Sequence, residues 1–240
     1  MKYVVLVVLL VCFTSGPVAG TDVYRGVAVR DGGAIEGRIG YAGPLPDPVT
    51  YKPTKDVEVC GPGAHTTDEI SVNSEGGVRY ALVYLTDIEE GAALDRKSAA
   101  RLDQTGCQFV PHIVTVPRGG TLEIFNNDGI LHNVRTSSKK NAPFNKAQPK
   151  FMKKIKHRFT SGPEKIKVNC DAHSWMSAWI VVTEHPYYTV TDEHGAFVLP
   201  DVPAGTYNIA IWHESFGIRN SEVTVPSGQS VRVDATFAKE

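Results

Sequence analysis

The sequence has few cysteines, no excess of either charge and no long apolar run beyond its first residues. Cysteine occurs four times in 240 residues, and 25 lysines and arginines stand against 26 aspartates and glutamates. The balanced charge argues against a general nucleic-acid binder. No later stretch approaches the roughly 18 consecutive apolar residues of a membrane-spanning helix, so we expect no membrane insertion of the mature chain.

Motifs of enzymatic chemistry are also missing from the sequence. We find no nucleophile elbow, no glycine loop that could cradle phosphate and no paired-carboxylate motif. We therefore expect that the protein is not an enzyme in its own right.

The single apolar run lies at the start of the chain. Residues 1–20, MKYVVLVVLLVCFTSGPVAG, carry Lys2 as their only charged side chain and end in small residues. This pattern is typical of an export signal peptide. The stretch LLVC around Cys12 resembles a lipoprotein signal, but the bulky Val11 argues against lipidation. We expect a periplasmic or extracellular protein in an oxidising space.

Short β-strand patterns are abundant in the rest of the chain. Runs such as TLEIFNND and TYNIAIWHE alternate apolar with polar residues, and Gly, Pro, Asn or Asp separate them. The pattern predicts an all-β, sandwich-like fold. Only residues 91–103, GAALDRKSAARLD, could form a helical turn or two. About 220 mature residues could form one large β domain or two small ones, and we expect two.

One segment differs in charge from its surroundings. Residues 137–158, SSKKNAPFNKAQPKFMKKIKHR, carry eight lysines and arginines and no acid. Lysines commonly protect edge strands from pairing with other chains, so a solvated loop and strand edge is the favoured interpretation. The alternative is a docking patch for an acidic partner.

The stretch KVNCDAHSWM places Cys170, His173 and Met176 at three-residue steps. Thiolate, imidazole and thioether, with a second imidazole, suit a copper ion that cycles between two oxidation states. His132, in IFNNDGILHNVRT, offers that imidazole from a strand end and its following turn. Each residue alone has an ordinary explanation, as a turn histidine, a core methionine or an inert buried thiol. Together they predict a copper site.

The sequence around these residues resembles that of the cupredoxins, which are small blue-copper β-sandwiches. The similar stretches are VTVPRGGTLEIFNNDGILHNV and FTSGPEKIKVNCDAHSWMSAWIVV, within residues 98–183, and the Cys-x2-His-x2-Met spacing is most similar to that of amicyanin. The resemblance implies that Asn133 hydrogen-bonds across to the other ligand loop. It also implies four copper ligands, namely His132, Cys170, His173 and Met176.

The cysteine count agrees with a metal site. Removal of Cys12 with the signal peptide leaves Cys60, Cys107 and Cys170, an odd number for an exported protein. If Cys60 pairs with Cys107, Cys170 remains as a thiolate that copper or zinc would hold and protect from oxidation.

The C-terminal part resembles a second family. The stretch YYTVTDEHGAFVLPDVPAGTYNIAIWHESFG is similar to the carboxypeptidase regulatory-like, transthyretin-type β-sandwich, whose hallmark positions are Asp192, Gly195, Phe197, Pro203, Gly205 and Tyr207. The usual first strand has its pattern much earlier, in residues 32–46, with RYALVYL expected as its partner strand. We therefore expect residues 21–97 and 184–240 to form this sandwich, with a cupredoxin-like domain of residues 98–183 inserted.

The whole run also resembles exported bacterial proteins of a methylamine-utilisation type, which establishes no role in amine metabolism. In WHES, His213 and Glu214 flank what should be an exposed strand end. A packed or hydrogen-bonded role for them is favoured over a catalytic or second metal role.

These observations lead to one expected function and two alternatives. We expect an exported copper protein that carries single electrons to a redox partner protein, with copper near the surface behind His173 and a neighbouring face used for docking. One alternative is a copper chaperone or store. The other is a structural or interaction module in which the metal only staples the inserted domain.

Overall fold

The structure is a computed structural model and describes residues 24–44 and 47–238. The expected signal peptide, residues 1–20 with Cys12, lies outside the described residues. Strands dominate the described part, whose one helix is the short α1 (Val57–Cys60). This helix is not long and apolar enough to cross a membrane. The all-β expectation is confirmed.

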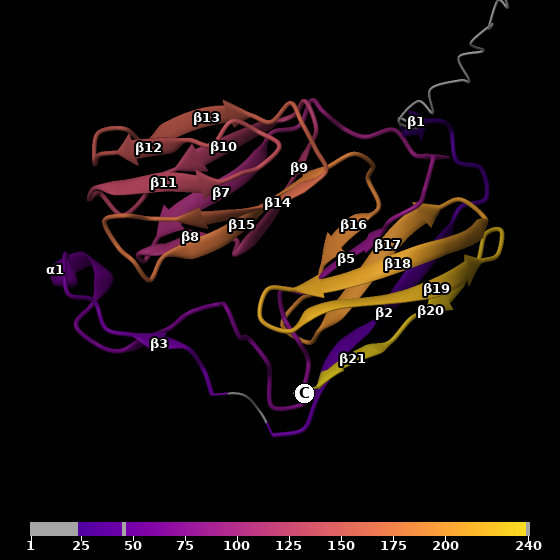
Figure 1. The fold of residues 1–240 in the computed structure, drawn as a ribbon, viewed down its shortest axis with the longest axis horizontal. Coiled ribbons are helices and arrows are strands. Elements are labelled where there is room, and N and C mark those ends of the chain that lie inside the picture. Colours follow the sequence, from indigo (N-terminus) through magenta and orange to yellow (C-terminus); the bar gives the residue numbers. More distant parts are fainter. Residues whose placement is uncertain (1–23, 45–46, 239–240) are drawn as a thin grey trace, which may run out of the picture.

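Two sheets form a first sandwich, at the upper left of Figure 1. One sheet has the order β13–β10–β7–β8 and the other the order β12–β11–β14–β15–β9. Two neighbouring pairs, β10 with β7 and β15 with β9, are parallel. The strands are β7 (Ala100–Thr105), β8 (Gln108–Val110), β9 (Ile113–Pro117), β10 (Thr121–Phe125), β11 (His132–Ser137), β12 (Asn145–Gln148), β13 (Lys154–Arg158), β14 (Glu164–Asn169) and β15 (Ser177–Thr183).

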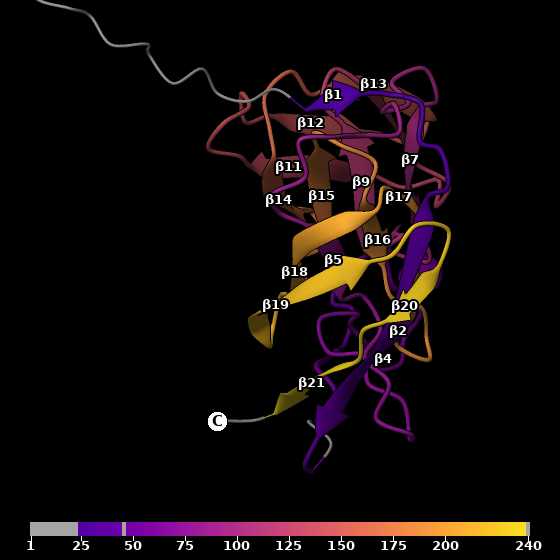
Figure 2. The same cartoon turned by 90° about the vertical axis from the view of Figure 1, so that its right-hand side faces the viewer.

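A second sandwich faces the viewer in Figure 2, with the first behind and above it. Its sheets have the orders β16–β5–β18–β19 and β17–β2–β20, and β21 also pairs with β2. The strands are β2 (Gly33–Ala42), β5 (Leu82–Leu85), β16 (Tyr188–Val190), β17 (Ala196–Val202), β18 (Gly205–His213), β19 (Gly217–Val225), β20 (Ser230–Arg232) and β21 (Ala235–Ala238). Early and late parts of the chain therefore share this sandwich.

Alternation along the strands builds each core. On β10 the side chains of Leu122 and Ile124 are fully buried, whereas their neighbours are partly exposed. On β2, Ile35 and Ile39 are likewise fully buried in the second core. Successive side chains of a strand point to opposite faces of its sheet, so a period-two pattern buries one face.

Strand β15 departs from this alternation because both of its faces are covered. Ala178 and Ile180 belong to the first core, but Val181 packs with Leu82 of β5 and Ile113 of β9 in a third apolar cluster. Aromatic side chains surround that cluster, namely Tyr80, Tyr84, Trp179, Tyr188 and Trp212. Burial of Val181 and Trp179 against the second sandwich thus joins the two.

The predicted D-x-x-G turn connects β16 to β17. The Asp192 carboxylate accepts hydrogen bonds from the backbone amides of His194 and Ala196, both at 2.8 Å. Gly195 has φ +76°, and a Cβ atom there would lie 2.2 Å from the Ile39 carbonyl oxygen. Glycine is required because the turn is left-handed and touches a neighbouring backbone.

Two local expectations are wrong. Residues 91–103 form no helical turn, because β6 (Glu90–Gly91) and β7 occupy the two ends of this stretch. β6 pairs with β1 (Arg25–Gly26), and β7 pairs with β10. The strand within RYALVYL, β5, does not pair with β2, because it lies between β16 and β18 in the opposite sheet. Alternation predicts a strand but not its neighbour.

The chain between the early strands of the second sandwich crosses to the first sandwich. Residues 50–66, here called the covering segment, contain β3 (Thr50–Tyr51), α1 and β4 (His65–Thr66), and β3 pairs with β4. Figure 1 shows this part at the lower left, below the strands of the first sandwich. By sequence it was assigned to the second sandwich, yet its contacts are with the ligand loops of the first.

Candidate metal centre

The hairpin of β14 and β15 positions three of the four predicted ligands. Its last pair is Asn169 with Ser177, so residues 170–176 form the connecting loop. The loop is closed by a hydrogen bond from the Cys170 amide to the Met176 carbonyl oxygen, at 3.2 Å. The Met176 amide in turn donates to the His173 carbonyl oxygen at 3.0 Å. These bonds hold Cys170, His173 and Met176 on one compact turn.

The fourth predicted ligand, His132, is the first residue of β11. The sequence had indicated a position at the end of a strand and in the turn that follows it. In the structure His132 instead begins a strand. β11 pairs with β14, with Arg135 opposite Asn169, and this pairing brings His132 to the same end of the sheet as the loop.

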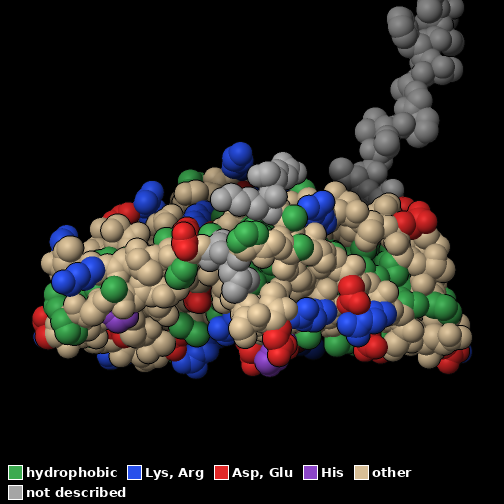
Figure 3. Space-filling view, turned by 90° about the horizontal axis from the view of Figure 1, so that it is seen from below, with side chains coloured by type: hydrophobic (Ala, Val, Ile, Leu, Met, Phe, Trp, Pro, Cys, Tyr) green, Lys and Arg blue, Asp and Glu red, His purple; other side chains and the backbone are tan. Residues whose placement is uncertain are grey.

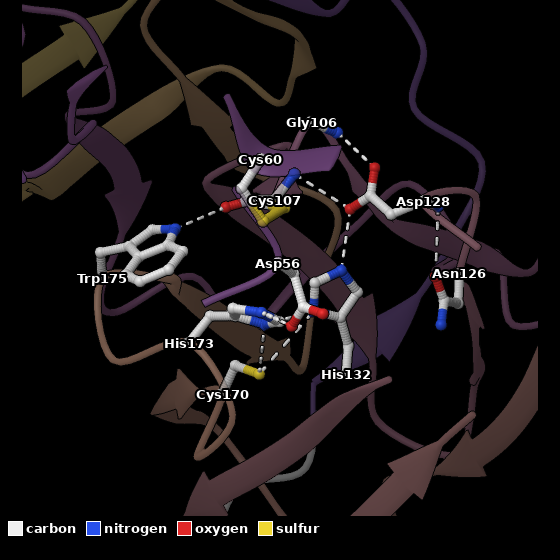
Figure 4. The surroundings of a disulfide bond; sticks show 10 residues. All are labelled: Asp56, Cys60, Gly106, Cys107, Asn126, Asp128, His132, Cys170, His173 and Trp175. Carbon is white, nitrogen blue, oxygen red and sulfur yellow. Dashed lines mark hydrogen bonds and ion pairs between the residues drawn. A yellow bond between two sulfur atoms is a disulfide. The ribbon is translucent and has the colours of Figure 1, made fainter. Parts of the chain in front are cut away.

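Nitrogen and sulfur atoms converge at this end (Figure 4). The Nδ1 atoms of His132 and His173 lie 2.9 Å apart, and the Cys170 Sγ atom lies 3.9 Å from each. The exposed fractions of the four side chains are 0% for His132 and His173, 2% for Cys170 and 1% for Met176. All four predicted ligands are thus buried, and three of them, His132, Cys170 and His173, bring nitrogen and sulfur atoms together at one point.

The protonation of the site decides which protons a metal ion must displace. Burial opposes a charge on His132, but the Asp128 carboxylate and Cys170 outweigh burial and raise the pKa of His132 to about 9, so a metal ion would have to displace a proton from this imidazole. Burial also raises the pKa of the Cys170 thiol, yet its contact with His132 and backbone hydrogen bonds lower it overall. The thiolate is the form that binds metals, so a thiolate and two imidazoles fit a soft or borderline ion such as copper or zinc.

A carboxylate contacts the outer nitrogen of each imidazole. His132 Nε2 lies 2.8 Å from Asp128 Oδ2, and His173 Nε2 lies 2.9 Å from Asp56 Oδ2. The Asp128 carboxylate also accepts backbone hydrogen bonds from Gly106 at 2.6 Å and Cys107 at 2.9 Å. Such pairs fix ring orientation and tautomer, leaving Nδ1 of each ring directed at the centre.

Asn133 connects the two ligand-bearing segments. Its Oδ1 atom accepts hydrogen bonds from the amide of Asp171 at 2.6 Å and of Ala172 at 3.3 Å, and from the Cys170 thiol at 3.4 Å. Its Nδ2 atom donates to Asn145 Oδ1 at 2.7 Å. The Asn133 side chain therefore ties the cysteine end of the loop to β11.

The covering segment is attached over the site by a disulfide. Cys60 at the end of α1 is bonded to Cys107, and Cys170 is the free cysteine of the described residues. The predicted pairing is therefore present. Cys107 Sγ, Asp128 and His132 also lie within 4.8 Å of one another, but Cys107 is oxidised and supplies no thiolate for a second metal site. The bridge thus lies directly beside a predicted ligand.

Aromatic stacking adds a second attachment. The rings of Tyr51 and Trp175 lie parallel, 5.0 Å apart with an interplanar angle of 9°. Because the Asp56 carboxylate and the segment around it cover His173, this histidine has no exposed surface. Copper was expected near the surface behind His173, but the structure places Asp56 and its segment over this histidine, through a contact between residues far apart in the sequence.

By sequence, His213 and Glu214 were expected at an exposed strand end. In the structure they are instead buried where the sandwiches meet. His213 is 1% exposed and its ring stacks on Phe216 at 4.4 Å. The Glu214 carboxylate pairs with His112 and with Lys167 Nζ, the latter at 2.6 Å. His213 is thus packed and Glu214 is paired, and both have these contacts where the sandwiches meet.

The lysine-rich stretch of residues 137–158 contains β12 and β13, which are edge strands of their sheets. Lys154 and Lys156 on β13 pair with Glu123 at 3.2 and 2.8 Å. Figure 3 shows the opposite face of the molecule, seen from below, and charges of both signs are interspersed there. The positions agree with the interpretation that these lysines protect strand edges.

One known family matches the C-terminal part of the chain. A family model of the carboxypeptidase regulatory-like domain matches residues 176–238. This match begins at the end of the ligand loop and continues through the late strands of the second sandwich. A sequence comparison with curated proteins gave no match.

Solved structures similar to this chain include several copper proteins. A copper-containing nitrite reductase (NirK) from Thermus scotoductus SA-01 is 20% identical with a TM-score of 0.34, over 42% of this chain and 25% of the reductase chain. An oxidised proline-to-glycine mutant of amicyanin is 20% identical with a TM-score of 0.32, over 39% and 90% of the respective chains. A purple cupredoxin from Nitrosopumilus maritimus is 17% identical with a TM-score of 0.30, over 36% and 100%.

Sequence reasoning did not find Asp56 or Asp128 as partners of the imidazoles. Asp128 had a local signal, since it stands four residues before His132 in NNDGILH. Asp56 stands 117 residues before His173, and nothing in its surrounding sequence indicates metal chemistry. Only the folded chain shows that contact.

Proposed function

We propose that this protein is an exported copper protein that carries single electrons between redox partner proteins and is not an enzyme in its own right. The observation that carries the proposal is the convergence of His132 Nδ1, His173 Nδ1 and Cys170 Sγ in a buried site. A copper ion there would exchange one electron between Cu(II) and Cu(I), two states that this mixed donor set suits.

The protein supplies binding, orientation and exclusion of water. Asp128, Asp56 and Asn133 hold the imidazoles and the cysteine loop in place through the hydrogen bonds described above. Their fixed positions favour electron transfer because the donor atoms need to move little between oxidation states. Water and substrates cannot reach ligand side chains that are at most 2% exposed, which argues for a carrier over an enzyme.

The disulfide supports the proposed location. Bridges such as Cys60–Cys107 form and persist in oxidising compartments and are rare in the cytosol. We propose export to the periplasm or the cell exterior, with partners of the one-electron carrier class.

Reconstitution with Cu(II) tests the proposal. The wild-type mature protein should develop an intense visible thiolate-to-copper absorption band, a matching electron paramagnetic resonance spectrum and a reversible redox couple. His132→Ala and Cys170→Ser should lose the band because each removes a predicted ligand. His194→Ala, an exposed histidine of the second sandwich, is the matched control and should keep it.

Other outcomes identify the alternatives. Tight Cu(I) binding without a visible band in the oxidised protein would indicate a chaperone or store. Partner binding that survives Cys170→Ser unchanged would indicate a structural or interaction module. A wild-type protein that stays colourless and metal-free would overturn the copper assignment.

A further inference from the structure

The covering segment removes the most direct route for an electron between the site and the surface. The outer edge of His173 is held by Asp56, and the ring has no exposed surface. A redox partner therefore cannot touch a ligand imidazole. If the site exchanges electrons at all, other atoms must connect it to the outside.

An aromatic stack leads outward from the buried imidazole. The rings of His173 and Trp175 lie 5.1 Å apart between centroids, and Trp175 stacks on Tyr51 at 5.0 Å and 9°. Tyr51 in turn stacks on His65 at 5.2 Å and 18°. Trp175, Tyr51 and His65 are all partly exposed, in contrast to His173. The stack therefore joins the buried site to the surface through rings in van der Waals contact.

The rings are fixed in place. Trp175 Nε1 donates a hydrogen bond to the Cys107 carbonyl oxygen at 3.1 Å, and Cys107 is bonded to Cys60 of the covering segment. Tyr51 and Trp175 both line a surface hollow of about 350 Å³. Electronic coupling falls steeply with each gap between atoms, and stacked π systems present smaller gaps than side chains separated by water.

We propose that Trp175 and Tyr51 carry the electron between the buried site and this hollow, which deepens the proposed function and rests on it. One electron leaves the reduced site and reduces a one-electron outer-sphere acceptor at the hollow. No bond is made or broken and no proton moves. A competing exit is the backbone of Asn169, which adjoins Cys170 and lines the same hollow.

The copper-loaded, reduced wild-type protein and its variants are oxidised with hexacyanoferrate(III) in a stopped-flow instrument. Tyr51→Leu keeps an apolar side chain but removes the ring, and its rate should fall several-fold. Tyr51→Phe keeps the ring, and its rate should match the wild type, because among the described residues the Tyr51 hydroxyl has no hydrogen-bond partner. Tyr84→Leu removes a ring stacked on Tyr188 in the other sandwich and should have no effect.

Three further measurements separate electron transfer from packing. The visible spectrum and the reduction potential of Tyr51→Leu should equal those of the wild type. In the metal-free variant, Cys170 should stay as unreactive toward a thiol reagent as in the wild type, which shows that the site is still covered.

The proposal is overturned if Tyr51→Leu reacts at the wild-type rate, as the Asn169 route predicts. It is equally overturned if the rate changes only together with the spectrum, the potential or the reactivity of Cys170. If the wild-type protein has the copper band but Tyr51→Leu is oxidised at the wild-type rate, the aromatic route alone is refuted. A colourless wild-type protein refutes the copper function and this route with it.

Discussion

Individual carboxylates decide how the two imidazoles are presented. Asp56 lies on the covering segment and has φ 50°, a left-handed backbone conformation that Asp tolerates better than most residues. Its carboxylate contacts His173 Nε2, as Asp128 contacts His132 Nε2. Each histidine thus has its own carboxylate, and the pair leaves both Nδ1 atoms facing the centre.

Asp56→Asn should weaken Cu(I) binding. Loss of an outer hydrogen-bond partner of a metal-binding histidine typically lowers metal affinity by about 10- to 100-fold. The measurement is a competition titration of wild-type and variant protein against a Cu(I) chelator. Glu58→Gln is the matched control, since Glu58 lies exposed on helix α1, which begins directly after Asp56 in the covering segment. Equal affinities of Asp56→Asn and Glu58→Gln would show that the Asp56 contact does not support the site.

Among the elements, the covering segment contains some of the shortest pieces of regular structure, although it covers the candidate metal centre. Its helix α1 spans only Val57–Cys60, and its strands β3 and β4 have two residues each. Such short pieces cannot hold their position alone. The Cys60–Cys107 bridge and the Tyr51–Trp175 stack attach them to the ligand loops, so the segment is kept in place by contacts distant in sequence.

The double variant Cys60→Ser, Cys107→Ser should be less stable and less well covered. The bridge joins residues 47 apart, and its removal should lower the free energy of unfolding by about 4 kcal/mol on the loop-entropy model. Urea unfolding of the metal-free protein measures this loss. In the native variant Cys170 should also react faster with a thiol reagent, because the segment no longer shields it.

Labelling of the unfolded, unreduced wild-type protein is the control for this pairing. One reactive thiol, Cys170, should be found among the cysteines of the mature chain. Three reactive thiols would contradict the bridge, and unchanged protection of Cys170 in the double variant would show that other contacts suffice to cover the site.

At the scale of the whole molecule, a buried ionic network joins the two sandwiches. Glu214 follows β18 of the second sandwich and contacts three residues of the first: His112, Lys167 on β14 at 2.6 Å, and Trp179 Nε1 on β15 at 2.8 Å. Burial raises the pKa of Glu214, but these partners outweigh it and lower the pKa to about 2. The network should therefore stabilise the protein only while Glu214 is ionised.

Glu214→Gln should destabilise the protein at neutral pH by about 3 kcal/mol, because the pKa difference between the unfolded and folded states sets the contribution of the carboxylate. A lowered folded-state pKa means that this contribution is complete above the unfolded pKa near 4.5 and is lost as the pH falls toward 2. The difference in the free energy of unfolding between variant and wild type, measured with urea, should therefore become smaller as the pH falls.

Glu184→Gln is the matched control for this prediction. Glu184 pairs with Arg118 at 2.9 Å, but both side chains are about a third exposed, so its removal should change stability by less than about 1 kcal/mol. A Glu214→Gln effect that is as small, or that does not depend on pH, would contradict a stabilising role of the network.

Local patterns in the sequence predicted much of this protein. Alternation along β2 and β10 predicted strands and an all-β fold, because side-chain direction in a strand depends only on neighbouring residues. The spacing of Cys170, His173 and Met176 predicted that they share one loop. The odd cysteine count indicated a free thiol once Cys60 and Cys107 pair, as the structure shows.

What only the tertiary structure decided is which distant residues meet. Four such contacts left no periodic pattern in the sequence. They are the placement of β5 in its sheet, the covering of His173 by Asp56, the stacking of Tyr51 on Trp175 and the pairing of Glu214 with His112. Such contacts depend on how whole strands pack and on where a long connection returns, not on local backbone preferences. The sequence by itself predicted which side chains form the candidate metal centre, and the fold determined that they are closed off from solvent.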